Sequence, residues 1–300
     1  MFDDWPQKDL QRLWRYYIAR YGAYAVTFLI TQEYNLGQGK PEQHVPKMLA
    51  LGEFIKATDP YKRAMTVHPW VFSRDSGRAR DEPWMDFTML QGGHRHFMKS
   101  TQYVNVYRHE PHKPLVESEA NYEGFAATNF VVDADAIRRT AYTAIQSGCC
   151  GFSYGAQGLY SGVLSHSFPG TTAQWGPVLT WDEGLHLSGG AQMRHVRACY
   201  ESVAWWKLEP RPEALSPAGD VLVKADDAQT LVLYYLSKGK VPSSAQLVGL
   251  PKTARYRGEW FDPRDGRQKP LAEPLSATAQ GLLLPQRPDP RDWLLILRRE

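Results

Sequence analysis

The sequence contains no stretch long and apolar enough to cross a bilayer as a helix. No apolar run approaches the ~18–20 residues that a membrane-spanning helix needs, so no membrane span is expected. The first residues, MFDDWPQKD, have neither the basic region nor the apolar region of a signal peptide. A longer form that carried such a peptide would be secreted or periplasmic, and the localisation therefore stays open.

Signatures of phosphate, metal and nucleic-acid binding are also missing. There is no glycine-rich loop of the GxGxxG or Walker type. The three cysteines, two of them adjacent (Cys149 and Cys150), lack metal-ligand spacing, and their odd number argues against a disulfide framework. We expect this adjacent pair to be buried free thiols in a strand-like run. A net charge of +3 is too small to indicate a nucleic-acid partner.

Aromatic residues, in contrast, are abundant. The 300 residues include 10 Trp and 16 Tyr, within an ordinary globular composition of 43% hydrophobic residues. Most such rings in any protein fill its core. Rings of this kind also serve as platforms for the apolar faces of sugars, so the composition is compatible with a carbohydrate ligand.

Residues 1–210 alternate helix-like and strand-like segments. Helices are expected at 10–21, 42–57, 95–107, 133–147 and 189–207, and strands at 23–30, 64–68, 86–90, 114–119 and 149–154. Strands that alternate with helices predict βαβ units and a parallel sheet. Five strands are compatible with part of a (β/α)8 TIM barrel, which needs eight, or with a doubly wound open sheet.

The pattern of residues changes after a proline-rich segment, 208–219, that is typical of a linker. Beyond it, short strand-like runs at 220–224, 230–236, 254–261 and 293–297 are separated by turn signals. This pattern predicts a small all-β sandwich. We therefore divide the chain into an α/β domain, 1–210, and a β-sandwich domain, 211–300.

Candidate site residues follow the predicted strands, because active sites of parallel α/β folds lie at the carboxyl ends of the strands. These residues, in chain order, are Glu33, His68, Trp70, His94, Glu117, Glu119, Tyr122 and Tyr154. Two carboxylates on opposite sides of a cleft are what glycosidic cleavage requires. Glu33 and Glu119 are the natural pair, and Glu117 shares a strand face with Glu119.

Two other kinds of chemistry are less well supported by these residues. The spacing of His68, His94, His96 and Glu33 matches no metal motif, so neither a metal nor another cofactor is expected. Ser118 has no GxSxG context, which argues against a serine hydrolase.

Several ordered segments resemble the apiosidase-like glycoside hydrolases: RYGAYAVTFLITQEYN, HPW, DFTMLQGGH, KPLVESEANYEG, GFSYGAQGLY and ESVAWWKLEP. Members of that family are (β/α)8 barrels, often followed by a small β-sandwich described as collagen-binding. The segments GEWFDPRDG and DWLLIL are similar to that sandwich. The resemblance covers nearly the whole chain.

The resemblance implies roles for particular residues. Glu33 stands at the family's general acid/base position, after barrel strand four, and Glu119 at the nucleophile position, after strand seven. His68, His94 and Tyr154 would line the sugar subsite. Gln32 before the acid and Ala120 after the nucleophile depart from frequent family choices, and these departures bear on which sugar is bound.

The same resemblance numbers the five predicted strands four to eight, so the first three are absent. A missing N-terminal segment or a partner chain would then complete the barrel. The implied activity is a retaining glycosidase that acts on side chains of plant or microbial polysaccharides. The alternative is a carbohydrate-binding or truncated remnant without turnover.

Overall fold

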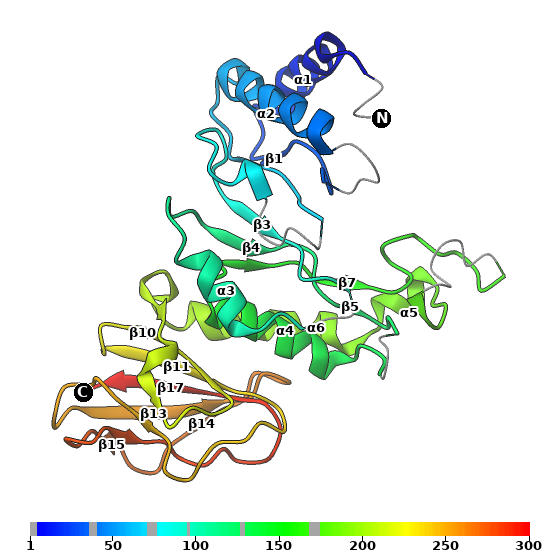
Figure 1. Cartoon of the computed structure of the whole chain (residues 1–300). Helices are drawn as coiled ribbons and strands as arrows, with labels where there is room; N and C mark the ends of the chain where they lie inside the picture. Colours follow the sequence, from blue (N-terminus) through cyan, green and yellow to red (C-terminus); the bar gives the residue numbers. More distant parts are fainter. Residues whose placement is uncertain (1–4, 36–40, 71–76, 95–96, 127–129, 168–174) are drawn as a thin grey trace. The chain divides into compact units, whose positions relative to one another are not determined.

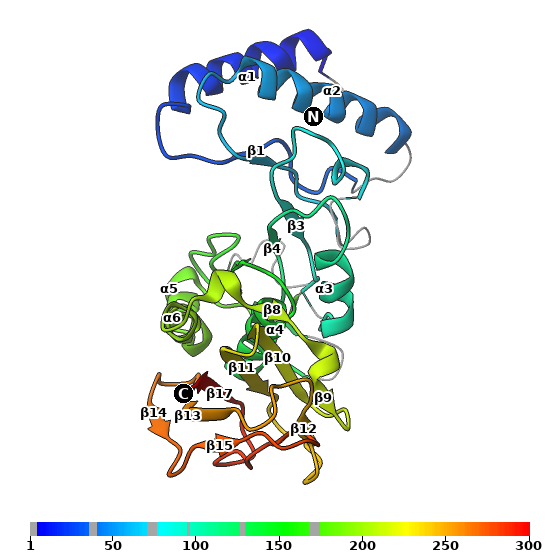
Figure 2. The same ribbon diagram turned by 90° about the vertical axis from the view of Figure 1, so that its left-hand side faces the viewer.

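The computed structural model describes residues 5–35, 41–70, 77–94, 97–126, 130–167 and 175–300 (Figures 1 and 2). The chain divides into two compact units. The first comprises residues 1–93, 106–120 and 149–153, and the second comprises residues 94–105, 121–148 and 154–300. Across the described ranges, no helix is long and apolar enough to cross a membrane.

The first unit begins with two helices over a short parallel ladder. Helices α1 (Gln7–Tyr21) and α2 (Pro41–Thr58) contact each other, and β1 (Phe28–Leu29) pairs in parallel with β2 (Met65–Thr66). Burial of apolar side chains from the helices and strands provides the main stabilisation of such a layer. Its core includes Leu10, Trp14, Ile18, Phe28, Ile30, Met48, Leu51, Ile55, Met65 and Val67.

A second parallel sheet completes this unit. It runs in the order β3 (Thr88–Leu90), β4 (Leu115–Glu117) and β6 (Gly151–Phe152). The parallel strands and their intervening helices confirm the expected mixed α/β character. Closure of the five strand positions into a barrel stays a prediction.

The strands of this unit are shorter than the sequence indicates. Residues 23–26 were expected to extend β1, but the N–H of Tyr24 donates to the carbonyl of Tyr21, and the N–H of Val26 donates to that of Tyr24. These local bonds form a turn, so the ladder begins only at Phe28. The expectation for Cys150 was wrong as well, because it lies just before β6 and is exposed, whereas Cys149 is buried.

Four α-helices and a second short parallel ladder, β5 (Tyr122–Glu123) with β7 (Gly155–Ala156), occur in the described residues of the second unit. The helices are α3 (Ser100–Tyr107, whose last two residues belong to the first unit), α4 (Ala134–Gln146), α5 (Trp181–Leu185) and α6 (Ser188–Glu201). Asp133 caps α4, since its carboxylate accepts the N–H of Ala136 at 2.9 Å. α6 ends at Glu201 rather than at residue 207, and a separate 3₁₀ turn covers Trp205–Lys207.

Two antiparallel sheets follow these helices in the second unit. The larger sheet has the order β14 (Gln268–Pro270), β13 (Arg255–Phe261), β17 (Trp293–Arg299), β11 (Thr230–Tyr235), β10 (Val221–Asp226), β8 (Glu209–Pro210), with β15 (Leu275–Ser276) also on β13. The smaller sheet has the order β16 (Leu282–Leu283), β12 (Gln246–Leu247), β9 (Leu215–Ser216). Both sheets contribute to one hydrophobic core, which includes Val223, Leu233, Tyr256 and Leu295 from the larger and Leu247 and Leu282 from the smaller.

The proline-rich segment is not a free linker. Its residues Glu209–Pro210 pair with β10, and Leu215–Ser216 pair with β12, while Leu208 is buried. Prolines are tolerated there because both pairings are short and lie at sheet edges, where a missing N–H breaks no central ladder. The domain boundary near residue 210 stays a prediction.

Helix α4 packs against the larger antiparallel sheet within the second unit. Tyr142 stacks on Tyr234 with ring centroids 5.0 Å apart, and Gln146 donates to the carbonyl of Val232 at 2.9 Å. The guanidinium of Arg138 binds both carboxylate oxygens of Asp292, at 2.8 and 3.0 Å. These contacts fix the helix on the sheet (Figure 1).

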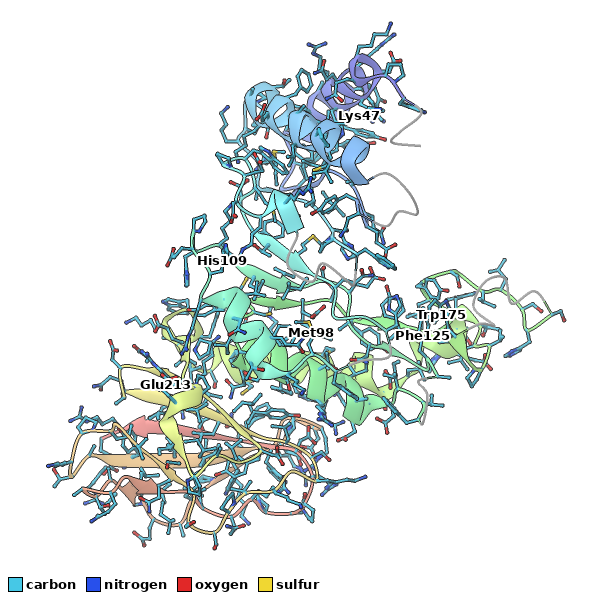
Figure 3. The ribbon with its side chains drawn as sticks, in the orientation of Figure 1. Lys47, Met98, His109, Phe125, Trp175 and Glu213 are labelled. Atoms are coloured by element: carbon cyan, nitrogen blue, oxygen red, sulfur yellow. The ribbon has the colours of Figure 1, made fainter. Side chains whose placement is uncertain are left out.

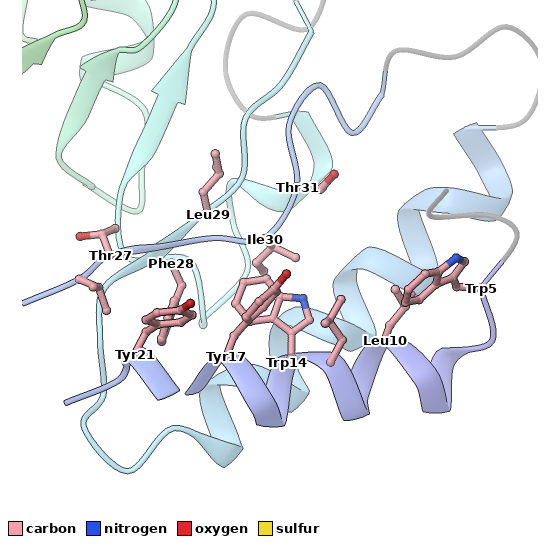
Figure 4. Close-up of a pocket in the computed structure, with 12 residues that line it drawn as sticks. Trp5, Leu10, Trp14, Tyr17, Tyr21, Thr27, Phe28, Leu29, Ile30 and Thr31 are labelled. Carbon is pink, nitrogen blue, oxygen red and sulfur yellow. The ribbon is translucent and has the colours of Figure 1, made fainter. Parts of the chain in front are cut away.

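A groove of about 570 Å³ runs along α1 and β1 in the first unit (Figure 4). Its lining is mainly apolar and includes Trp5, Trp14, Tyr17, Tyr21 and Leu29. Four of these side chains, Trp5, Tyr17, Tyr21 and Leu29, are exposed. β2 is the one strand that pairs with β1 in the described part of the chain.

Candidate active site

Glu119 and His68 form a buried pair at the ends of two parallel strands. Glu119 lies two residues after β4, and His68 lies two residues after β2. The Nε2 atom of His68 is 3.1 Å from Oε2 of Glu119, and the two residues are 4% and 9% exposed. With the ring proton on Nε2, the imidazole donates to the carboxylate and fixes its direction.

Backbone contacts hold His68 in place. Its N–H donates to the carbonyl of Thr31 at 3.1 Å, and its own carbonyl accepts the N–H of Tyr34 at 3.2 Å. The loop after β1, which carries Glu33, is therefore tied to the residues after β2. A further link joins the same loops, because Oδ1 of Asn35 accepts the N–H of Trp70 at 2.7 Å.

Glu33 is held by Gln91. The side-chain amide of Gln91, which is buried directly after β3, donates to Oε1 of Glu33 at 2.7 Å. Glu33 has a positive φ of 43°, a left-handed conformation that few residues other than glycine adopt. Gln91 was not among the predicted site residues, although its place directly after a predicted strand was a usable signal.

Glu117 is fully buried and anchors the loop after β3. Its Oε1 accepts the N–H of Gly92 at 3.0 Å. A Cβ at residue 92 would lie 2.9 Å from Oε2 of Glu117, so this close approach of backbone and carboxylate requires glycine. The adjacent Gly93 donates its N–H to the carbonyl of Glu119 at 3.3 Å. The loop that carries Gln91 is thereby connected to Glu119.

Five predicted residues, Glu33, His68, Trp70, Glu117 and Glu119, thus lie in the first unit and share connected loops. The other three, His94, Tyr122 and Tyr154, lie in the second unit. Among the residues that the structure describes, no three His, Cys, Asp or Glu side chains are grouped to hold a metal ion.

An aromatic cluster surrounds Tyr122 in the second unit. Its ring centroid lies 4.5 Å from that of His94, 5.0 Å from that of Phe125 and 5.6 Å from that of Tyr160. Trp175 stacks on Phe125 with ring centroids 5.4 Å apart and an interplanar angle of 9°. Figure 3 labels both residues. Phe125, Tyr160 and Trp175 were missed, because nothing in their sequence spacing indicates that they converge.

Tyr154 is bound to a buried carboxylate in the same unit. Its hydroxyl donates to Oε2 of Glu123 at 2.7 Å, and the N–H of Gly189 donates to Oε1 at 3.0 Å. Burial, followed by this hydrogen bond, raises the pKa of Tyr154 far above its ordinary value. Tyr154 is therefore a neutral donor at any physiological pH.

Comparison with solved structures defines the class of fold. A structure described as a glycoside hydrolase matches with a TM-score of 0.79 and 18% identity, over 98% of this chain and 69% of its own. A glycoside hydrolase family 5 structure from Bacteroides vulgatus ATCC 8482 matches with a TM-score of 0.79 and 18% identity, over 97% and 67%. At this identity the likeness shows the fold, a mixed α/β fold shared with glycoside hydrolases.

The family follows from the sequence itself. The profile of the family described as "Apiosidase-like, catalytic domain" matches residues 4–207, which is more than half of the chain. The chain belongs to this family, and the family resemblance of the sequence is confirmed. No curated protein matches the chain at a significant level.

Proposed function

We propose that the chain is a retaining glycoside hydrolase in which Glu33 is the general acid/base and Glu119 the nucleophile. The observation that carries the proposal is the buried pair of Glu119 and His68, connected through the loop of Gln91 to Glu33, in a member of the apiosidase-like family. Retaining glycoside hydrolases use two carboxyl groups in different environments, one as the acid/base and one as the nucleophile.

In the first step, Glu33 gives its proton to the leaving oxygen while a Glu119 oxygen attacks the anomeric carbon. The bond to the leaving group breaks, and a glycosyl-enzyme forms. In the second step, Glu33 takes a proton from water, which attacks the same carbon and releases Glu119. Retention predicts that the two carboxyl groups approach to about 5–5.5 Å.

The five strands β1, β2, β3, β4 and β6 would correspond to strands four to eight of a (β/α)8 TIM barrel. The two antiparallel sheets would form the β-sandwich domain that begins near residue 211. The sugar would come from a plant or microbial polysaccharide side chain. Of the predicted sugar-binding residues, His68 and Trp70 lie in the same unit as the two carboxylates and would contact the sugar there. Glu117 is fully buried and would position the loop of Gln91.

The test compares aryl glycosides that differ in the acidity of the leaving phenol. We expect Glu33→Ala to lose about 10²–10⁴-fold in kcat/KM on glycosides of weakly acidic phenols, because their leaving oxygen needs a proton. The loss should be much smaller on dinitrophenyl glycosides, whose leaving group departs without one. Product analysis by NMR should show retained anomeric configuration.

Glu53→Ala is the matched control, because Glu53 is an exposed carboxylate of α2 in the same unit. It should hydrolyse both kinds of substrate at the parent rate. An equal loss on both substrates in Glu33→Ala would remove Glu33 from the acid/base role. A folded parent chain that binds saccharides without turnover would favour the carbohydrate-binding alternative.

A further inference from the structure

The second unit carries a separate groove of about 480 Å³ that uses none of the candidate catalytic or sugar-binding residues. It is lined by the first residues of α4, by the turn after β11, and by two phenylalanines from different loops, Phe97 and Phe130. The two rings stack with centroids 5.7 Å apart and an interplanar angle of 12°.

This aromatic pair presents an apolar surface at the groove. The guanidinium of Arg139 lies 4.7 Å from the ring centroid of Phe97, which fixes that ring further. Phe130 remains 41% exposed. An exposed aromatic ring that already stacks on a neighbour offers an apolar face on which the flat apolar face of a ligand can stack.

Oriented carboxylates surround the rings. Asp133 accepts the N–H of Ala136, Asp135 pairs with Arg138 at 2.9 Å, and Asp220 accepts the N–H of Lys240 at 2.7 Å. All three carboxylates line the groove, and each is oriented by one of these bonds. Fixed carboxylates accept hydrogen bonds from adjacent hydroxyl groups without further ordering.

The charges of the lining select against acidic ligands. Asp133, Asp135 and Asp220 outnumber the two cations, Arg139 and Lys238. Metal binding does not account for the cluster, since the described residues contain no group of three possible ligands. A ligand with a flat apolar face, several hydroxyl groups and no negative charge fits both the rings and the carboxylates.

We propose that this groove is an accessory binding site for a neutral saccharide chain. The inference rests on the proposed function, because the saccharide bound in this groove is of the same chemical class as the proposed substrate. The site holds polysaccharide through Phe130 and the three aspartates and takes no part in the bond cleavage.

The test is affinity electrophoresis of the full chain in native gels that contain galactomannan, xyloglucan or arabinan, with polygalacturonic acid as the acidic probe. We expect retardation in at least one neutral gel and none in the acidic gel. Phe130→Ala should weaken this retention by about tenfold, because the stacking surface is lost. Phe130→Tyr, which keeps the ring, should restore it.

Val131→Ala is the control, since Val131 is an exposed neighbour outside the groove. Hydrolysis of small aryl glycosides should be the same in Phe130→Ala and in the parent. The absence of retardation in all neutral gels, retention only by polygalacturonic acid, or unchanged retention in Phe130→Ala would each overturn the proposal. Retention that depends on Phe130 in a chain without hydrolytic activity would preserve this site and remove the proposed function.

Discussion

Glu119→Ala is expected to lower kcat/KM for aryl glycosides by about 10⁴-fold or more, the scale of loss seen when a nucleophile is removed. Without the carboxylate, no oxygen is positioned to attack the anomeric carbon, and His68 loses its buried partner. Sodium azide should restore turnover of dinitrophenyl glycosides, because the small anion can occupy the space that the side chain leaves. The product should then be the glycosyl azide with inverted configuration, which NMR can identify.

Glu110→Ala is a suitable control for this experiment. Glu110 lies in the same unit, nine residues before Glu119, and its side chain is 80% exposed. It should retain the parent kcat/KM and gain nothing from azide. If Glu119→Ala keeps more than about a tenth of the parent activity, with an unchanged melting temperature, Glu119 is not the nucleophile.

Asp292→Ala is expected to lower the free energy of unfolding by about 3–5 kcal/mol. The side chains of Asp292 and Arg138 are 0% and 6% exposed and share a two-point contact. Removal of the carboxylate leaves a guanidinium charge inside the protein without its main partner. Urea denaturation, followed by circular dichroism, measures the change.

Two variants separate this effect from a general response to mutation. Glu201→Ala breaks an exposed pair with Arg197 on α6 and should cost only about 0.5 kcal/mol. The double variant Arg138→Met with Asp292→Leu should be more stable than Asp292→Ala alone, because it removes both buried charges. A loss below about 1 kcal/mol in Asp292→Ala would mean that the pair does not hold α4 on the sheet.

Local sequence patterns predicted the order of the elements better than their extent. The apolar run after Gly22 predicted a strand at the right place, but the turn at residues 23–26 shortened it, since ladder length depends on the partner strand. The runs at 220–224 and 230–236 predicted β10 and β11 at nearly the right places, because these two paired strands and their turn are contiguous in the sequence. The α/β class followed from the same kind of local signal.

The candidate site was predictable only in its parts. Strand ends led to Glu33, His68 and Glu119, since parallel strands place their following residues at one edge. The contact between Gln91 and Glu33 spans 58 positions, and that between Arg138 and Asp292 spans 154. Contacts at such separations are set by tertiary packing, which no local pattern reports.

The groove along α1 and β1 has a consequence for the behaviour of the chain in solution. Exposed aromatic side chains such as Tyr17 and Tyr21 lie beside a strand that has one partner in the described structure. Surfaces of this kind attract other apolar surfaces and other strand edges. Chaperones and hydrophobic dyes should therefore bind this face. The fraction of the protein that stays unaggregated should fall as the protein concentration rises.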